Sequence, residues 1–200
     1  MKTVGVTQRV SVSANPAERR DCLDQAWSHF LAACGLRPLL LPNVLEVALD
    51  LCAQDCIAGL VLTGGNDLAA LGGDAPERDA LEQELLQVAE RRGLPVLGVC
   101  RGMQVIQQRF GVRLRRVEGH VASRQVICIE GQREEVNSYH CYGALESPAP
   151  LEAWAAADDG VIKAVRHGSL PITGIMWHPE RRKPFTVGDL ALFQRVFKVG

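Results

Sequence analysis

The stretch Gly98-Val99-Cys100-Arg101-Gly102 decides how this 200-residue chain is interpreted. An apolar run, 94–99, leads into a cysteine that stands between two glycines, and a helix-like run, 103–110, leads out of it. This order is typical of a nucleophile elbow with cysteine in the place of serine, because a sharp turn from strand to helix leaves no room for bulky neighbours. The start of the helix also favours a thiolate over a thiol. A buried cysteine in a glycine-rich turn is the alternative interpretation.

Strand-like and helix-like segments alternate around this turn through the first half of the chain. The predicted strands are 3–8, 36–41, 59–62 and 94–99, and the predicted helices are 44–54, 76–92 and 101–110. A further helix is predicted to begin at Asn15-Pro16-Ala17-Glu18, with Asn15 as its cap, and to end at Gly35. The strands are continuously apolar, as in sheets that are covered on both faces. The alternation therefore predicts an α/β fold with a doubly wound, mostly parallel sheet.

The second half of the chain has a different pattern. Short strand candidates at 124–130, 134–138, 151–156, 161–167 and 172–177 are separated by Gly, Pro and Asp-Asp-Gly turn signals, and a final helix is predicted at 187–198. These strands are expected to form antiparallel hairpins that return to the sheet. Because no repeat or linker is visible, residues 1–200 are predicted to form a single domain.

Composition narrows the classes of function. The net charge of −1 gives no general attraction to nucleic acid or to an anionic membrane. Residues 1–6 resemble a first strand rather than a signal peptide, and no apolar run is long enough to span a bilayer. The odd count of seven cysteines argues against a disulfide framework, and Cys52 and Cys56 are interpreted as core residues rather than metal ligands. These features predict a cytoplasmic protein.

A cysteine nucleophile needs a base, and the base needs a group that orients it. His178 is the best candidate among the five histidines, because Pro179 holds it extended and Glu180 stands two positions further on. Positions two apart in an extended segment face the same side, so Glu180 can hold the imidazole while His178 faces a thiol. A strand-end turn with a surface glutamate is the alternative. His29 is expected to be structural and His167 to lie in an exposed turn.

A glycine-rich turn supplies the third element. Gly64 and Gly65 follow the predicted strand 59–62, at the end that lines the crevice of an open α/β sheet. Backbone N–H groups of such a turn can hold an oxyanion beside the nucleophile. An ordinary strand-to-loop turn is the alternative.

The order of these three elements resembles the class I glutamine amidotransferase-like superfamily with a Cys-His-Glu triad. The resemblance covers nearly the whole chain. It implies a flavodoxin-like fold and attack on a γ-glutamyl carbonyl, with Cys100 as nucleophile, His178 as general base and acid and Glu180 as the orienting group. It also implies an oxyanion hole made by the N–H groups of Gly65 and Arg101, and no metal or redox cofactor.

The resemblance also suggests how the substrate is held. Gln104 matches a position that helps to hold the γ-glutamyl group. The candidates for contacts with the α-amino and α-carboxylate groups of glutamate are Arg101, Asn66, Asp67, Asn137, Ser138, Tyr139 and His140. Ordinary surface-loop chemistry is the alternative for each of them.

The sub-family resemblance is to free-standing γ-glutamyl hydrolases, carried by Gly98–Gly102, by 77–79 and by 136–140. Cys141 and Tyr142 replace the usual His and Gln of that group, so recognition of the other half of the substrate is expected to differ. The start at 7–9 and the Gly-Ile-Met-Trp-His-Pro-Glu-Arg segment at the end look like γ-glutamyl-CDP-amidate hydrolases of capsule phosphoramidate pathways.

Three functions remain open on the sequence. The first is a γ-glutamyl hydrolase that acts on a small, nucleotide-linked substrate, and the second is a glutaminase subunit that passes ammonia to a separate synthase. The third is a non-catalytic relative that binds a ligand. Arg181, Arg182 and Lys183 follow Glu180 directly, so they are a hypothetical phosphate contact, with a solvated charged loop as the alternative.

Overall fold

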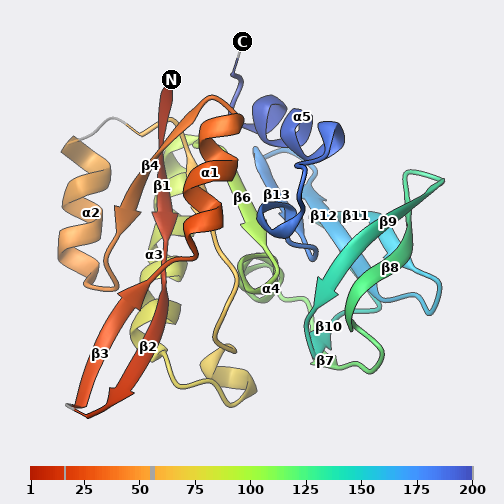
Figure 1. Cartoon of the computed structure of the whole chain (residues 1–200), viewed down its shortest axis with the longest axis horizontal. Helices are drawn as coiled ribbons and strands as arrows, with labels where there is room; N and C mark the ends of the chain where they lie inside the picture. Colours follow the sequence, from red (N-terminus) through yellow and green to blue (C-terminus); the bar gives the residue numbers. More distant parts are fainter. Residues whose placement is uncertain (16, 55–56, 200) are drawn as a thin grey trace.

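A computed structural model describes residues 1–15, 17–54 and 57–199, and its centre is a nine-stranded sheet (Figure 1). The strand order is β4-β1-β5-β6-β13-β12-β11-β8-β9. The first five are parallel to one another, and the other four continue the sheet as antiparallel strands. The bounds are β1 Lys2–Thr7, β4 Leu36–Leu41, β5 Leu60–Leu62, β6 Val96–Val99, β8 Val121–Ile129, β9 Gln132–Tyr139, β11 Leu151–Ala157, β12 Ile162–His167 and β13 Ile172–Ile175. The predicted α/β fold with a mostly parallel sheet and C-terminal hairpins is confirmed.

Helices cover both faces of the sheet (Figure 1). Buried apolar residues of α1 (Gln25–Ala33) and α5 (Val187–Val196) belong to one core cluster, which includes Phe30 and Phe193. Residues of α2 (Leu45–Gln54), α3 (Pro76–Arg92) and α4 (Arg101–Arg109) belong to a second cluster on the other face. The short elements are η1 Ala69–Leu71, η2 Pro179–Arg181, β7 Arg115–Arg116 and β10 Tyr142–Gly143. Burial on both faces explains why the parallel strands read as unbroken apolar runs.

The helix predicted to start at Asn15 is wrong. Residues Arg9–Ala14 (β2) and Ala17–Cys22 (β3) form an antiparallel hairpin, and the helix begins later, where the Asp24 carboxylate accepts a hydrogen bond from the Ala26 N–H. The same residue types that start helices also make turns, and the alternating pattern of 9–14 favours a strand. The proposed role of Pro16 lies outside the described residues.

Smaller predictions have mixed outcomes. His29 is exposed on α1 rather than placed in the core. Cys52 is buried, as predicted, whereas Cys56 lies outside the described residues. The described cysteines are free thiols. Each described helix is too short or too polar to cross a membrane.

Candidate active site

Cys100 lies at the turn between β6 and α4, as the elbow motif predicts. Its φ of 54° places a non-glycine residue in the left-handed region, which costs conformational energy and is typical of functional turns. The Cys100 N–H donates to the Ile175 carbonyl at 2.7 Å, so the turn is fixed to the adjacent strand β13. The thiol therefore stands at the carboxyl end of two neighbouring parallel strands, β6 and β13.

The two glycines of the elbow are required by close packing. A Cβ on Gly98 would lie 2.5 Å from the carbonyl group of Gly102, and a Cβ on Gly102 would collide with the Leu62 carbonyl oxygen. Helix α4 therefore approaches β5 and β6 at backbone distance. This approach requires small residues on both sides of the nucleophile.

His178 and Glu180 meet as predicted, with a local difference. The backbone of His178 is extended, but the chain then enters the short helix η2, which contains Glu180. The imidazole Nδ1 lies 2.8 Å from Glu180 Oε1, and both side chains are buried. Since Nδ1 is held by the carboxylate, Nε2 is the ring atom left for the thiol.

Asn137 holds the backbone of His178 from the other side. The Asn137 amide donates to the His178 carbonyl at 2.8 Å and accepts from the His178 N–H at 2.7 Å. The sequence predicts Asn137 as a substrate contact. The structure instead uses both ends of its amide to fix the histidine.

The electrostatics of His178 favour the charged ring. Burial alone would lower its pKa, but the negative charge of Cys100, a hydrogen bond between the two side chains and the Glu180 carboxylate together raise the pKa of His178 to about 9. The pair therefore suits a thiolate beside an imidazolium, the ground state of many cysteine nucleophiles.

Gly64 leaves the space that the imidazole fills. A Cβ there would lie 2.6 Å from His178 Cε1 and 3.5 Å from Cys100 Cβ. Gly64→Ala is expected to displace the ring and to lower kcat about 100-fold, since a shift of 1 Å can have that effect. Glutamate release and thermal unfolding measure the two consequences separately. Gly188→Ala is the matched control because no atom lies within 4 Å of its Cβ position; a Gly64→Ala protein with the wild-type kcat would contradict the argument.

The turn after β5 presents its N–H groups to the thiol. Arg78 donates to the carbonyl oxygens of Thr63, Gly64 and Gly65 at 2.7, 3.2 and 2.5 Å. In a trans peptide the N–H points away from the preceding C=O, so the Gly65 N–H faces away from Arg78. The first N–H groups of α4, including that of Arg101, have no partner within the helix. These are the two donors that the sequence predicts for an oxyanion hole.

A buried charge network supports this turn. Glu82 accepts from Thr7 at 2.7 Å, from Arg78 at 3.0 Å and from the guanidinium of Arg101, which also contacts Asp79. Arg78, Glu82 and Arg101 are almost fully buried. Sequence reasoning missed Glu82 because charges four apart on a helix look like an exposed pair. The Arg101 side chain is used in this network, so its guanidinium does not face a substrate.

A cavity of about 320 Å³ opens beside the thiol. It is lined by Gly65, Asn66, Asp67, Cys100, Arg101, Gln104, Tyr139, His140 and Cys141. Asp67 is exposed there, whereas the Asn66 amide is bonded to both backbone groups of Val10. The Gln104 amide donates to the Tyr142 carbonyl at 3.0 Å. Most predicted substrate contacts therefore come together at one cavity, whereas Asn137 and Ser138 do not line it.

Lys163 is a buried cation behind the cavity that the sequence did not reveal. Its ammonium donates to Ser138 Oγ at 3.0 Å and to His140 Nε2 at 2.7 Å. His140 donates from Nδ1 to the Tyr142 carbonyl, so its tautomer is fixed. Burial and the Lys163 charge lower the pKa of His140 to about 3, and burial lowers that of Lys163 to about 8. His140 is therefore neutral and cannot act as the acid.

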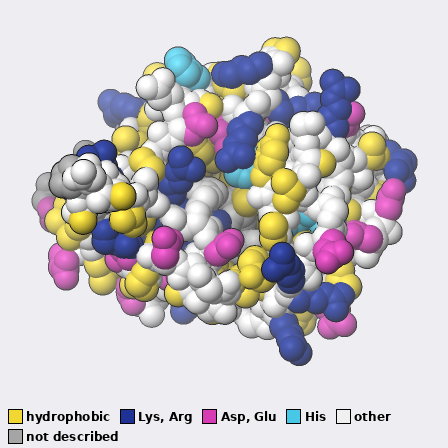
Figure 2. Space-filling view, turned by 60° about the horizontal axis from the view of Figure 1, so that its bottom comes forward, with side chains coloured by type: hydrophobic (Ala, Val, Ile, Leu, Met, Phe, Trp, Pro, Cys, Tyr) yellow, Lys and Arg dark blue, Asp and Glu magenta, His cyan; other side chains and the backbone are white. Residues whose placement is uncertain are grey.

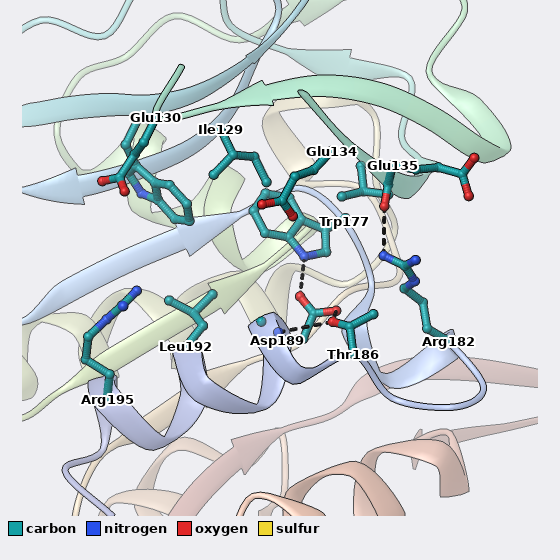
Figure 3. Close-up of a pocket in the computed structure, with 13 residues that line it drawn as sticks. Ile129, Glu130, Glu134, Glu135, Trp177, Arg182, Thr186, Asp189, Leu192 and Arg195 are labelled. Carbon is teal, nitrogen blue, oxygen red and sulfur yellow. Dashed lines mark hydrogen bonds between the residues drawn. The ribbon is translucent and has the colours of Figure 1, made fainter. Parts of the chain in front are cut away.

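The basic segment after Glu180 divides between two sides of the molecule. Arg181 stacks over the Tyr139 ring at 5.0 Å, near the cavity. Arg182 instead donates to the Glu135 carbonyl at 2.8 Å and lines a separate cavity between β9 and α5, with Trp177 and Asp189 (Figure 3). The Lys183 ammonium lies 4.2 Å from the Phe185 ring centre. Of the three, Arg181 alone lines a hollow that contains His178.

Comparison with known families places the chain. A family model described as Peptidase C26 matches residues 2–123 and 115–180. The chain is an amide-bond hydrolase of the class I glutamine amidotransferase-like type. Within that class, it belongs to the Peptidase C26 family.

Individual relatives agree with this family. The chain is 29% identical to a γ-glutamyl-CDP-amidate hydrolase of Campylobacter jejuni, over 89% of this chain and 90% of that protein. It is 31% identical to one subunit of a glutamine-hydrolysing GMP synthase of Methanospirillum hungatei, over 70% and 72% of the two chains. A crystal structure of a GMP synthase subunit from Thermoplasma acidophilum has the same fold, with a TM-score of 0.75 at 17% identity, over 99% and 93%. The predicted superfamily is confirmed.

Proposed function

We propose that the protein hydrolyses a γ-glutamyl amide through a γ-glutamyl thioester on Cys100 and releases glutamate. The observation that carries the proposal is the contact of Cys100 with His178, itself held by Glu180, beside a cavity lined by Gln104 and Asp67. An amide carbonyl in this cavity lies between the thiol and the N–H groups of Gly65 and Arg101.

The reaction divides into two steps. The Cys100 thiolate attacks the γ-carbonyl carbon, and the two N–H groups hold the oxyanion, each donor being worth about 3–4 kcal/mol of barrier. His178 protonates the leaving nitrogen as the C–N bond breaks, which leaves a thioester. His178 then takes a proton from water, and the hydroxide releases glutamate and restores the thiolate.

For the leaving group we propose CDP-amidate, so that the substrate is γ-glutamyl-CDP-amidate and the reaction belongs to capsule phosphoramidate synthesis. The similarity to the Campylobacter jejuni enzyme along nearly all of both chains supports this choice. The second candidate is a glutaminase subunit that delivers ammonia to a synthase, which the similarity to the GMP synthase subunit favours.

A screen of purified protein tests these alternatives. Glutamate release is measured with γ-glutamyl-CDP-amidate, with glutamine and with neutral γ-glutamyl amides. The proposal expects the CDP-linked substrate to have the highest kcat/KM. Glutamine hydrolysis that becomes fast only after a synthase is added would support the second candidate, and no glutamate from any substrate would refute both.

The pH dependence of activity follows from His178. Its folded pKa of about 9 lies above the ordinary 6.5, so the imidazolium is present at neutral pH and is lost as the pH rises through about 9. We expect kcat/KM to fall above pH 9, because the leaving nitrogen then lacks its acid. The stability that the ion pair contributes is complete below pH 6.5 and is lost over the same rise. Thiol and imidazole titrate as a pair, so the measured midpoint belongs to both; an alkaline limb centred near 6.5 would contradict this assignment.

A further inference from the structure

A small hollow adjoins the substrate cavity and shares Gly65 with it. The hollow is lined by residues of the β5 turn, by His178 and Glu180, and by side chains of β2, β3, α1 and η2, among them Arg9, Asp24 and Arg181. Because His178 lines the hollow while Cys100 lines the cavity, the hollow lies on the side of the histidine. The leaving nitrogen must approach His178 to receive its proton, so the group on that nitrogen extends toward this hollow.

Arg9 is packed against the oxyanion turn. Its Cδ and Cβ lie 2.9 and 3.3 Å from the position that a Cβ on Gly65 would take. The stem of Arg9 is thus fixed beside a proposed oxyanion donor, while the residue is exposed. Within the described parts of the chain, no hydrogen bond or ion pair of its guanidinium is present. The guanidinium therefore keeps its donors for a ligand.

Arg181 comes from the opposite wall of the hollow. It stacks on Tyr139, and its Nε lies 3.4 Å from Glu180 Oε1. Its side chain is 39% exposed. Stacking of a planar guanidinium on a ring restricts its motion and leaves the outer N–H groups available. A ligand that accepts hydrogen bonds thus meets a cation on each side.

The carboxylates at the hollow already have partners. Glu180 holds His178, and the Asp24 carboxylate accepts from the Ala26 N–H at the start of α1. The charge left for a ligand is that of the two arginines. Figure 2 shows this face of the molecule, with a histidine near its middle and Lys or Arg side chains beside it.

We propose that Arg9 and Arg181 form a subsite for an anionic phosphoryl group attached to the leaving nitrogen of the substrate. The proposal rests on the γ-glutamyl hydrolysis proposed above and specifies its leaving side. Arginine N–H groups match the oxygens of a phosphoryl group in pairs, and an ammonia leaving group has no use for two cations. Neutralisation of the phosphoryl charge also makes the nitrogen a better leaving group. Arg182 has no part in the subsite.

Substitution of each arginine tests the subsite. The kcat/KM for γ-glutamyl-CDP-amidate is divided by that for a neutral γ-glutamyl anilide, in wild type, Arg9→Ala, Arg181→Ala and the control Arg182→Ala. Loss of one charged hydrogen-bond donor is expected to lower this ratio about 10- to 100-fold, mainly through KM. The control leaves the ratio within about twofold of wild type. Equal losses on both substrates, or an unchanged ratio, would overturn the subsite.

A second measurement separates this idea from the identity of the substrate. CDP is used as an inhibitor of anilide hydrolysis, so turnover of the CDP-linked compound is not needed. Competitive inhibition by CDP that weakens at least tenfold in Arg9→Ala and Arg181→Ala, and weakens with added salt, supports the subsite. A wild-type protein that cleaves the anilide but is not inhibited by CDP would refute the subsite while leaving γ-glutamyl hydrolysis standing.

Discussion

Serine in place of Cys100 is expected to lower kcat for γ-glutamyl hydrolysis by about 10⁴- to 10⁶-fold, the loss seen when a covalent nucleophile is removed. The imidazolium of His178 stabilises a thiolate, and a serine hydroxyl ionises far less readily than a thiol. Rapid quenching after a short pulse of substrate, followed by intact-protein mass spectrometry, detects the thioester directly. The wild type should carry one γ-glutamyl group, and Cys100→Ser should carry none.

Cys128→Ser is the matched control for this experiment. Cys128 is a free thiol on β8 and does not line the substrate cavity. Its serine variant should form the adduct as the wild type does. An adduct that persists in Cys100→Ser, or activity within tenfold of wild type, would sink the assignment of the nucleophile and would revive a ligand-binding role.

Glu82→Gln is expected to have the largest effect on stability. The substitution leaves the buried guanidiniums of Arg78 and Arg101 without their shared anion, and breaking a buried ion pair in this way costs about 3–5 kcal/mol. For a chain of this size that corresponds to a Tm lower by roughly 6–20 °C. Thermal and urea unfolding measure the change. Glu84→Gln, on the same helix and only partly buried, should stay within about 0.5 kcal/mol of wild type.

The acid side of the stability curve provides an independent check on Glu82. Burial would raise the pKa of this carboxyl, but the charges of Arg101 and Arg78 outweigh burial and hold the pKa below its ordinary 4.5. The carboxylate therefore stabilises the fold above pH 4.5, and this stabilisation is lost as the pH falls through the lowered value. The difference between wild type and Glu82→Gln should shrink in acid; a difference that stays constant into strong acid would show that the carboxylate charge is not its source.

The sequence was sufficient for the elements whose signals are local. Gly98, Cys100 and Gly102 identify the elbow because steric limits on the turn act on neighbouring residues. Pro179 and Glu180 likewise act on His178 within one short segment. The geometry brings these groups together because β6 and β13 are adjacent parallel strands.

Buried charge could not be found in the same way. Arg78, Glu82 and Lys163 have the residue types of a solvated surface, and only the tertiary packing buries them. Arg9 was missed for a related reason, because its position depends on the β2–β3 hairpin. Asn15 and Glu18 satisfy local rules for a helix start, but the pairing of β2 with β3 overrides those rules.

The place of β13 in the sheet has a consequence for biosynthesis. The parallel strands β1, β4, β5 and β6 leave the ribosome first, and domains begin to fold as they emerge. At that stage β6 has an unpaired edge, since its neighbour β13 follows all the antiparallel strands in the chain. A nascent chain thus passes through a period with a formed elbow and no acid–base partner. Competence to cleave an amide arrives only when β13 inserts between β6 and β12 and brings His178 to the thiol.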